Sequence, residues 1–182
     1  MPTIFSHAIF ASALGTTFRS TSRPARFWIL TCLCAMLPDA DVISFTFGIR
    51  YGSMFGHRGI THSIAFALLV GLVISVFFTE QKIAKWKLVL YFALVTVSHP
   101  LLDMLTNGGS GVALFAPFSA QRFYFPWRPV DVSPIGMNFF SERGLPVILS
   151  EALWIWVPSV LIVTIIWLIR KNDLPKDPEP GQ

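Results

Sequence analysis

Charged residues are scarce in this sequence of 182 residues. Asp, Glu, Lys and Arg make up 13% of it, about half of their usual share in a soluble domain, and 53% is hydrophobic. The 14 Lys and Arg outnumber the 10 acids by too little to form a surface that binds nucleic acid. This composition excludes a disordered chain and an ordinary cytosolic protein. It predicts an integral membrane protein with no nucleic-acid partner.

Cysteine is nearly absent. The two cysteines, Cys32 and Cys34, stand two positions apart in an apolar run. A helix would point their side chains in different directions, so a disulfide between them is geometrically poor. We expect both to be inert thiols that pack against apolar neighbours.

Long uncharged runs account for most of the sequence, and such runs are typical of transmembrane helices. We predict an all-α fold, an integral membrane helical bundle of about five helices, in one membrane-embedded domain over residues 1–171. Residues 172–182 are rich in proline and charge and are expected to form a disordered cytoplasmic tail. The uncharged runs are Ile4–Phe18, Phe27–Leu37, Gly59–Thr79, Leu88–Leu102 and Ala152–Ile169.

Cations with few accompanying acids fall in alternate connections between the predicted helices. Because cytoplasmic loops of membrane proteins carry an excess of Lys and Arg, these connections are predicted to be cytoplasmic. The N-terminus, residues 38–58 and residues 103–144 then lie on the extracytoplasmic side of a multi-pass protein. The cations of the predicted cytoplasmic connections are Arg19, Arg23 and Arg26, then Lys82, Lys85 and Lys87, and finally Arg170 and Lys171.

All four histidines and several acids fall at the predicted extracytoplasmic ends of the helices. Ionisable groups near membrane depth are costly, and they usually line a functional cavity or pair with one another. Imidazole and carboxylate together suit Zn²⁺ or Mn²⁺. Because the set exceeds the four ligands of one tetrahedral site, we predict a site for two ions. The candidate ligands are His7, Asp39, Asp41, His57, His62, His99, Asp103 and Glu151.

Local spacing supports this set unevenly. His99 and Asp103 are four positions apart and share one face of a helix. Asp39 and Asp41 follow Pro38, which is expected to end a helix and leave both acids on a turn where they can aim at one point. A single histidine is more often a packing residue than a ligand. The metal prediction therefore depends on all four histidines falling at one end.

Aromatic residues and arginines are dense between residues 115 and 134. Aromatic residues of this density suit the headgroup level of a bilayer. The other interpretation is a lid over the site, with Arg122 and Arg128 binding a substrate phosphate. Arg58 and Arg143 could serve that role equally well.

Three segments carry the pattern of a known family. They read Pro38-Asp39-Ala40-Asp41, Gly56-His57-Arg58-Gly59-Ile60-Thr61-His62-Ser63 and Ser98-His99-Pro100-Leu101-Leu102-Asp103. With these segments the chain resembles the YdjM-like family of bacterial inner-membrane proteins, described as membrane-bound metal-dependent hydrolases. The resemblance implies a multi-pass protein of the bacterial inner membrane that uses divalent metal, with Zn²⁺ the expected ion.

That family is similar, more remotely, to zinc-dependent phospholipase C and related single-strand nucleases, which share an all-α fold. The common order of ligands is matched here by His7, Asp39 or Asp41, His57 or His62, and His99 with Asp103. The chain has no histidine after His99, so the later histidine ligands of those enzymes have no counterpart. The resemblance implies chemistry at phosphorus.

These observations predict a membrane-bound metal-dependent hydrolase. It would cleave a phosphoester or phosphodiester of a lipid or lipid-linked substrate at the outer leaflet. Asp39 or Asp41 would act as the general base, and Arg58 or Arg122 would contact the phosphate. The alternatives are a divalent-metal transporter or metal-binding membrane protein without hydrolytic activity, and a structural membrane subunit. Transport sites usually lie near the bilayer midplane, whereas these residues fall at one end.

Overall fold

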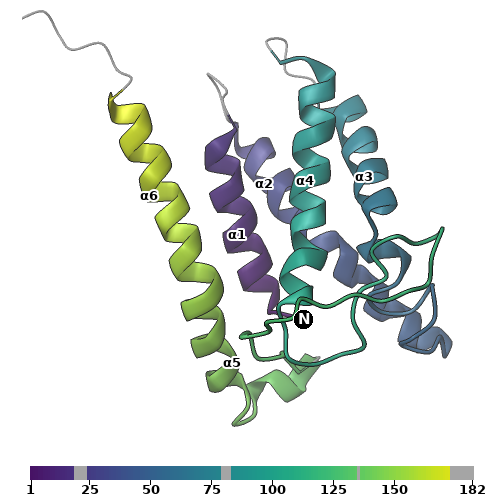
Figure 1. Cartoon of the computed structure of the whole chain (residues 1–182). Coiled ribbons are helices and arrows are strands. Elements are labelled where there is room, and N and C mark those ends of the chain that lie inside the picture. The colour runs from purple at the N-terminus through teal and green to yellow at the C-terminus, as the bar shows by residue number, and fades with distance from the viewer. Residues whose placement is uncertain (19–23, 79–82, 135, 173–182) are drawn as a thin grey trace, which may run out of the picture.

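The computed structural model describes residues 1–18, 24–78, 83–134 and 136–172. No β-strand occurs among them, and strand-like pairing is limited to isolated bridges between Thr106 and Val130 and between Val112 and Phe123. The predicted all-α fold is therefore confirmed. The α-helices of Figure 1 are α1 (Ile4–Thr17), α2 (Ala25–Met36), α3 (Ile64–Phe77), α4 (Lys85–Met104), α5 (Gly144–Glu151) and α6 (Val157–Asn172).

Shorter helical segments extend or precede these helices. A 3₁₀ helix, Leu37–Phe47, continues α2, and a second one, Ile60–His62, precedes α3. A π-helical turn, Ala152–Trp156, joins α5 to α6, and a third 3₁₀ helix spans Gly136–Phe140. The helices predicted from the sequence thus correspond to α1, α2 with its extension, α3, α4 and the continuous α5–α6 rod.

Three helical stretches are long and apolar enough to cross a membrane. They are Ala25–Phe47, Lys85–Met104 and Gly144–Lys171, with 23, 20 and 28 residues. Helices α1 and α3 are apolar but have only 14 residues each, fewer than the roughly 20 that usually span the hydrocarbon core. Of the predicted tail 172–182, Asn172 ends α6; residues 173–182 and the predicted cytoplasmic cations Arg19, Arg23 and Lys82 lie outside the described residues.

Helix α4 is the element on which the site depends, because it packs against α1, α2 and α3. Its contact with α3 is close: a Cβ atom on Gly71 would lie 2.4 Å from the carbonyl oxygen of Val89, so a glycine is needed there. The helix also continues through Pro100 to Met104. The N-terminus, the start of α3 and the end of α4 consequently meet at one end of the bundle (Figure 1).

Candidate metal centre

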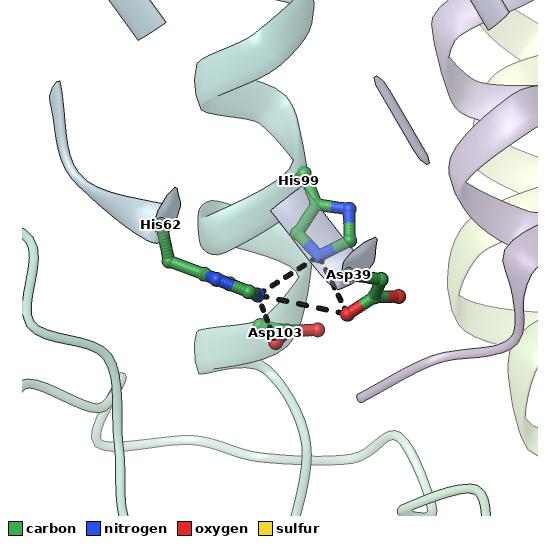
Figure 2. A group of neighbouring side chains, drawn as sticks. All are labelled: Asp39, His62, His99 and Asp103. Atoms are coloured by element: carbon green, nitrogen blue, oxygen red, sulfur yellow. Dashed lines mark hydrogen bonds and ion pairs between the residues drawn. The ribbon is translucent and has the colours of Figure 1, made fainter. Parts of the chain in front are cut away.

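Helix α4 supplies two residues of the centre, His99 and Asp103, from consecutive turns. Both side chains are fully buried. Their spacing predicts a shared face, and the structure places both in one group of possible ligand atoms with Asp39 and His62. Four of the predicted ligands are therefore close neighbours (Figure 2).

Asp39 and Asp41 lie on the 3₁₀ helix that continues α2, rather than on a turn as expected. Pro38 is tolerated there because it occupies the first turn, where its missing N–H has no helical partner. Residues two apart on a 3₁₀ helix point in different directions. Asp39 consequently contacts His99 and His62, whereas Asp41 contacts His57 and His62.

The segment before α3 places His62 opposite α4. Tight turns form it, and a Cβ atom on Gly59 would lie 2.1 Å from the carbonyl oxygen of Met54. The segment ends in the 3₁₀ turn Ile60–His62, after which the hydroxyl of Ser63 accepts a hydrogen bond from Phe66 N and caps α3. These local interactions fix the backbone that carries His62.

The spacing of the four ligand atoms fits a tetrahedral ion. His62 Nε2 lies 3.1 Å from His99 Nε2, 3.6 Å from Asp39 Oδ1 and 3.5 Å from Asp103 Oδ2, and His99 Nε2 lies 3.3 Å from Asp39 Oδ1. Ligands about 2.0 to 2.1 Å from a zinc ion are about 3.3 to 3.4 Å from one another in a tetrahedron. Four of the six separations are therefore close to those around a tetrahedral zinc ion, and all six are within 4.8 Å.

The Nδ1 atoms of His62 and His99 each contact an oxygen of the protein, as is usual for histidines that bind a metal through Nε2. His99 Nδ1 lies 2.6 Å from the backbone oxygen of Ala35. His62 Nδ1 lies 3.2 Å from Asp41 Oδ2. Hydrogen bonds of this kind place the proton on Nδ1 and leave Nε2 free to bind a metal.

Several buried polar atoms at the centre have no hydrogen-bond partner among the described residues. Buried polar atoms are almost always paired, and an unpaired one in a native structure points to a missing water or ion. The atoms concerned are Asp39 Oδ1, Asp103 Oδ1, and His7 Nδ1 and Nε2, whereas Asp103 Oδ2 forms an ion pair with Arg58 Nε at 2.8 Å. Their position beside the two Nε2 atoms supports a cation site.

The surroundings of His62 also favour positive charge. Asp39 Oδ1 lies 3.6 Å from its Nε2, and Asp41 Oδ2 lies 3.2 Å from its Nδ1. Two carboxylates therefore stabilise a cation at the position of this ring.

A second group of possible ligands, Asp41, His57 and His62, adjoins the first. In this group Asp41 is already saturated. Its Oδ1 lies 2.6 Å from His57 Nδ1, and its Oδ2 accepts from Arg58 N at 3.1 Å and from Thr61 Oγ1 at 2.6 Å besides approaching His62. These contacts favour Asp41 as an orienting residue. Thr61 was not among the candidates, because no spacing rule pairs it with Asp41.

His7 lies next to the four-residue group. Its ring stacks on that of His99, with 3.7 Å between the centroids, and its Nε2 lies 3.6 Å from Asp103 Oδ1. If the chain holds a second ion, His7 and this oxygen are the atoms nearest to the first group that have no other partner.

Glu151 lies outside both groups of possible ligands. Its buried carboxylate accepts hydrogen bonds from the backbone N–H and the hydroxyl of Thr3 and from the hydroxyl of Ser6. A negative charge is favourable at the N-terminus of a helix, so Glu151 stabilises the start of α1. Trp156 Nε1 donates to Ser6 Oγ at 2.7 Å and completes this connection between α1 and the α5–α6 rod.

Arg58 and Arg122, expected to contact phosphate, are bonded to the protein itself. Arg58 is fully buried; its Nε lies 2.8 Å from Asp103 Oδ2, and its other nitrogens donate to Thr106 Oγ1 and the Gly108 oxygen. Arg122 donates to four backbone oxygens, those of Tyr51, Ser53, His57 and Gly111. A phosphate would have to replace these partners, so the contacts favour positioning roles.

A buried group of two histidines and two aspartates at one end of an apolar helical bundle defines a membrane protein with a candidate metal centre. The sequence profile described as YdjM inner membrane protein matches residues 1–172. The chain therefore belongs to the YdjM family, as its motifs indicated. It is 40% identical over 177 residues to inner membrane protein YbcI of Escherichia coli (strain K12), covering 94% of this chain and 100% of that protein. No solved structure matches the chain.

Proposed function

We propose that the chain is a divalent-metal-dependent hydrolase of the bacterial inner membrane, and that it cleaves a phosphoester or phosphodiester bond of a membrane lipid or lipid-linked substrate. The observation that carries the proposal is the group of Asp39, His62, His99 and Asp103, whose possible ligand atoms all lie within 4.8 Å of one another, together with the unpaired Oδ1 atoms of both aspartates. Structural zinc sites are commonly built from cysteine, whereas this group consists of histidine and carboxylate; catalytic sites keep one position open for water, so three of the four residues would bind the ion directly during turnover or its coordination would expand. Zn²⁺ is the proposed ion, with Mn²⁺ the alternative.

A bound divalent ion would act as a Lewis acid, activating water and stabilising negative charge at phosphorus. The chain's own residues divide the remaining work. Arg58 holds Asp103, and Asp41 holds His57 and His62, because each pair is in direct contact. Asp39 is the acid of the group that is partly accessible, with 13% of its side chain exposed, whereas Asp103 is fully buried. We therefore propose that water reaches the ion on the side of Asp39, which itself serves as a ligand.

The assignment to phosphorus chemistry rests on the order of the candidate ligands along the chain, which is similar to that of zinc-dependent phospholipase C. We place the first ion at the four-residue group. A second ion, expected from the number of candidate ligands, would lie beside His7. We propose that the site faces the extracytoplasmic side, on the evidence of the distribution of Lys and Arg.

Metal analysis and turnover together test this function. Protein purified without chelator should contain at least one Zn²⁺ or Mn²⁺ per chain, and it should hydrolyse bis(4-nitrophenyl) phosphate or release a headgroup from phospholipid vesicles. His99→Ala should lower metal affinity by more than the roughly 10 to 100-fold typical of outer-shell changes. Asp131→Asn is the matched control, because Asp131 bonds Asn107 away from the group.

Each other outcome decides against part of the proposal. Absence of bound metal in the wild-type protein would overturn it. Bound metal with uptake of the ion into liposomes, but no turnover of either ester, would support a metal transporter instead. Equal metal content in His99→Ala and Asp131→Asn would move the site elsewhere.

A further inference from the structure

An apolar groove of about 530 Å³ runs along α2 and ends at the candidate metal centre. Its lining includes Ile4 of α1 and Val70 and Ile74 of α3. Asp39 is the only charged residue among the described residues that line it. The main apolar residues are Ile4, Leu33, Leu37, Val70 and Ile74.

The walls of this groove belong to segments that are apolar enough for a membrane. Leu33, Leu37 and Asp39 lie in the helical stretch Ala25–Phe47, and Val70 and Ile74 lie in α3. Leu33 and Leu37 are also exposed at the protein surface. In a bilayer the medium that contacts such a groove is hydrocarbon, so its natural occupant is the hydrocarbon chain of a lipid.

The groove reaches the metal centre through Asp39. The side chains of His62, His99 and Asp103 are completely buried, whereas Asp39 keeps 13% exposure and lines the groove. The groove therefore brings its occupant to one member of the candidate ligand group.

A second apolar groove, of about 460 Å³, lies between α1 and α6, and none of its lining residues belongs to the ligand groups. Position, not apolarity alone, distinguishes the groove that contains Asp39.

We propose that this groove binds one acyl chain of a membrane lipid, so that the substrate enters from within the bilayer with its phosphate at Asp39. This inference rests on the hydrolase function proposed above and adds the substrate class and its route.

Photolabelling with a lipid probe tests the groove without relying on turnover. The protein would be reconstituted in phosphatidylethanolamine and phosphatidylglycerol vesicles that contain a phosphatidylglycerol with a diazirine on one acyl chain. Labelling of residues 30–40 and 70–74 should exceed that of the outer face of α6 several-fold. Leu33→Trp should reduce the groove labelling several-fold by filling it.

Ile29→Trp is the matched control. Ile29 is 58% exposed and Leu33 54% exposed, one turn apart on α2, but Ile29 does not line the groove. The control should keep wild-type labelling, and both variants should keep the wild-type metal content. Leu37→Trp offers a second groove variant if Leu33→Trp fails to fold. Equal labelling in wild type and groove variants would overturn the proposal.

Measuring the hydrolysis of both esters distinguishes a wrong assignment of the groove from a wrong assignment of the protein as a hydrolase. If both stand, Leu33→Trp loses hydrolysis of phospholipid in vesicles at least tenfold but keeps hydrolysis of bis(4-nitrophenyl) phosphate. Phospholipid turnover that is equal in Leu33→Trp and Ile29→Trp would leave the hydrolase and reject the groove. Selective labelling without turnover of either ester would leave the groove as a lipid site and reject the hydrolase.

Discussion

Two aspartates at neighbouring positions, Asp39 and Asp41, occupy different environments in the centre. Asp39 has an unpaired Oδ1 facing two histidine nitrogens, whereas both oxygens of Asp41 accept from neighbouring groups. The difference follows from their 3₁₀ backbone, which turns the two side chains apart. The two acids should therefore respond differently to the same substitution.

Asp39→Asn should remove bound metal, because an amide is a much weaker ligand than a carboxylate. Asp41→Asn should keep part of the metal, with affinity lower by about 10 to 100-fold, because it weakens the orientation of His62 from the outer shell. Isothermal titration with Zn²⁺ would measure both effects. Metal loss that is as large in Asp41→Asn as in Asp39→Asn would show that Asp41 is itself a ligand.

Candidate site residues could be predicted from the sequence where a rare residue type or a helical spacing marked them. Rare histidines in an apolar chain, and the four-residue spacing of His99 and Asp103, led to residues that lie together. The partners of Glu151 could not be predicted in this way. Its bonds to Thr3 and Ser6 join positions almost 150 residues apart, and no local pattern encodes such a contact.

At the scale of elements, the turn between Gly56 and Gly59 holds the segment that carries His57 and His62. Gly59→Ala should destabilise the protein by about 1 to 3 kcal/mol or more, because the new Cβ would meet the Met54 oxygen at 2.1 Å. Gly52→Ala is the control, since open space surrounds that position. Thermal unfolding in detergent measures both. Equal melting temperatures in the two variants would contradict the packing described for this turn.

A second prediction concerns the loops that Arg122 joins. Arg122→Lys should lower the free energy of unfolding by about 1 to 3 kcal/mol, because an ammonium group cannot reach all four backbone oxygens in the geometry of a guanidinium. It should also speed proteolysis of residues 105–134. Arg128→Lys serves as the control, because Arg128 is exposed beside the Tyr124 ring.

The same Arg122 variant decides between two roles. If stability and proteolysis stay unchanged while the KM for a phosphate ester rises, Arg122 contacts phosphate as its sequence position suggested. If stability falls as expected, it is a positioning residue. The sequence indicated a loop rich in aromatic residues and arginine here, but the partners of Arg122 are backbone oxygens, which every residue possesses. Composition therefore could not reveal them.

Helix positions were the most predictable elements, because uncharged runs of hydrophobic residues are long and continuous. The lengths of the helices were less predictable than their positions. The run Gly59–Thr79 suggested one long span, yet α3 begins only at Ile64, after Gly59, a 3₁₀ turn and the Ser63 cap. Glycine and the serine cap compete with regular helix and outweigh hydrophobicity in this segment.

At the scale of the whole molecule, the bundle separates two kinds of residue. The described cations of the predicted cytoplasmic connections, Arg26, Lys85, Lys87, Arg170 and Lys171, lie on helix ends opposite the metal centre (Figure 1), whereas Arg50, Arg58, Arg122, Arg128 and Arg143 belong to the segments on the side of the centre. The N-terminus, the start of α3 and the end of α4 lie at the other end. This arrangement agrees with the parity inferred from charge and permits one topology test for all candidate ligands.

Cysteine accessibility tests the side on which the centre lies. In a protein without Cys32 and Cys34, Gly52→Cys and Ala120→Cys should react with a membrane-impermeant maleimide in intact spheroplasts, because both positions are exposed near the centre. Lys85→Cys, exposed at the opposite end, should react only after lysis, because Lys and Arg are retained on the cytoplasmic side. The reverse pattern would place the centre, and the lipid substrate proposed for it, at the inner leaflet.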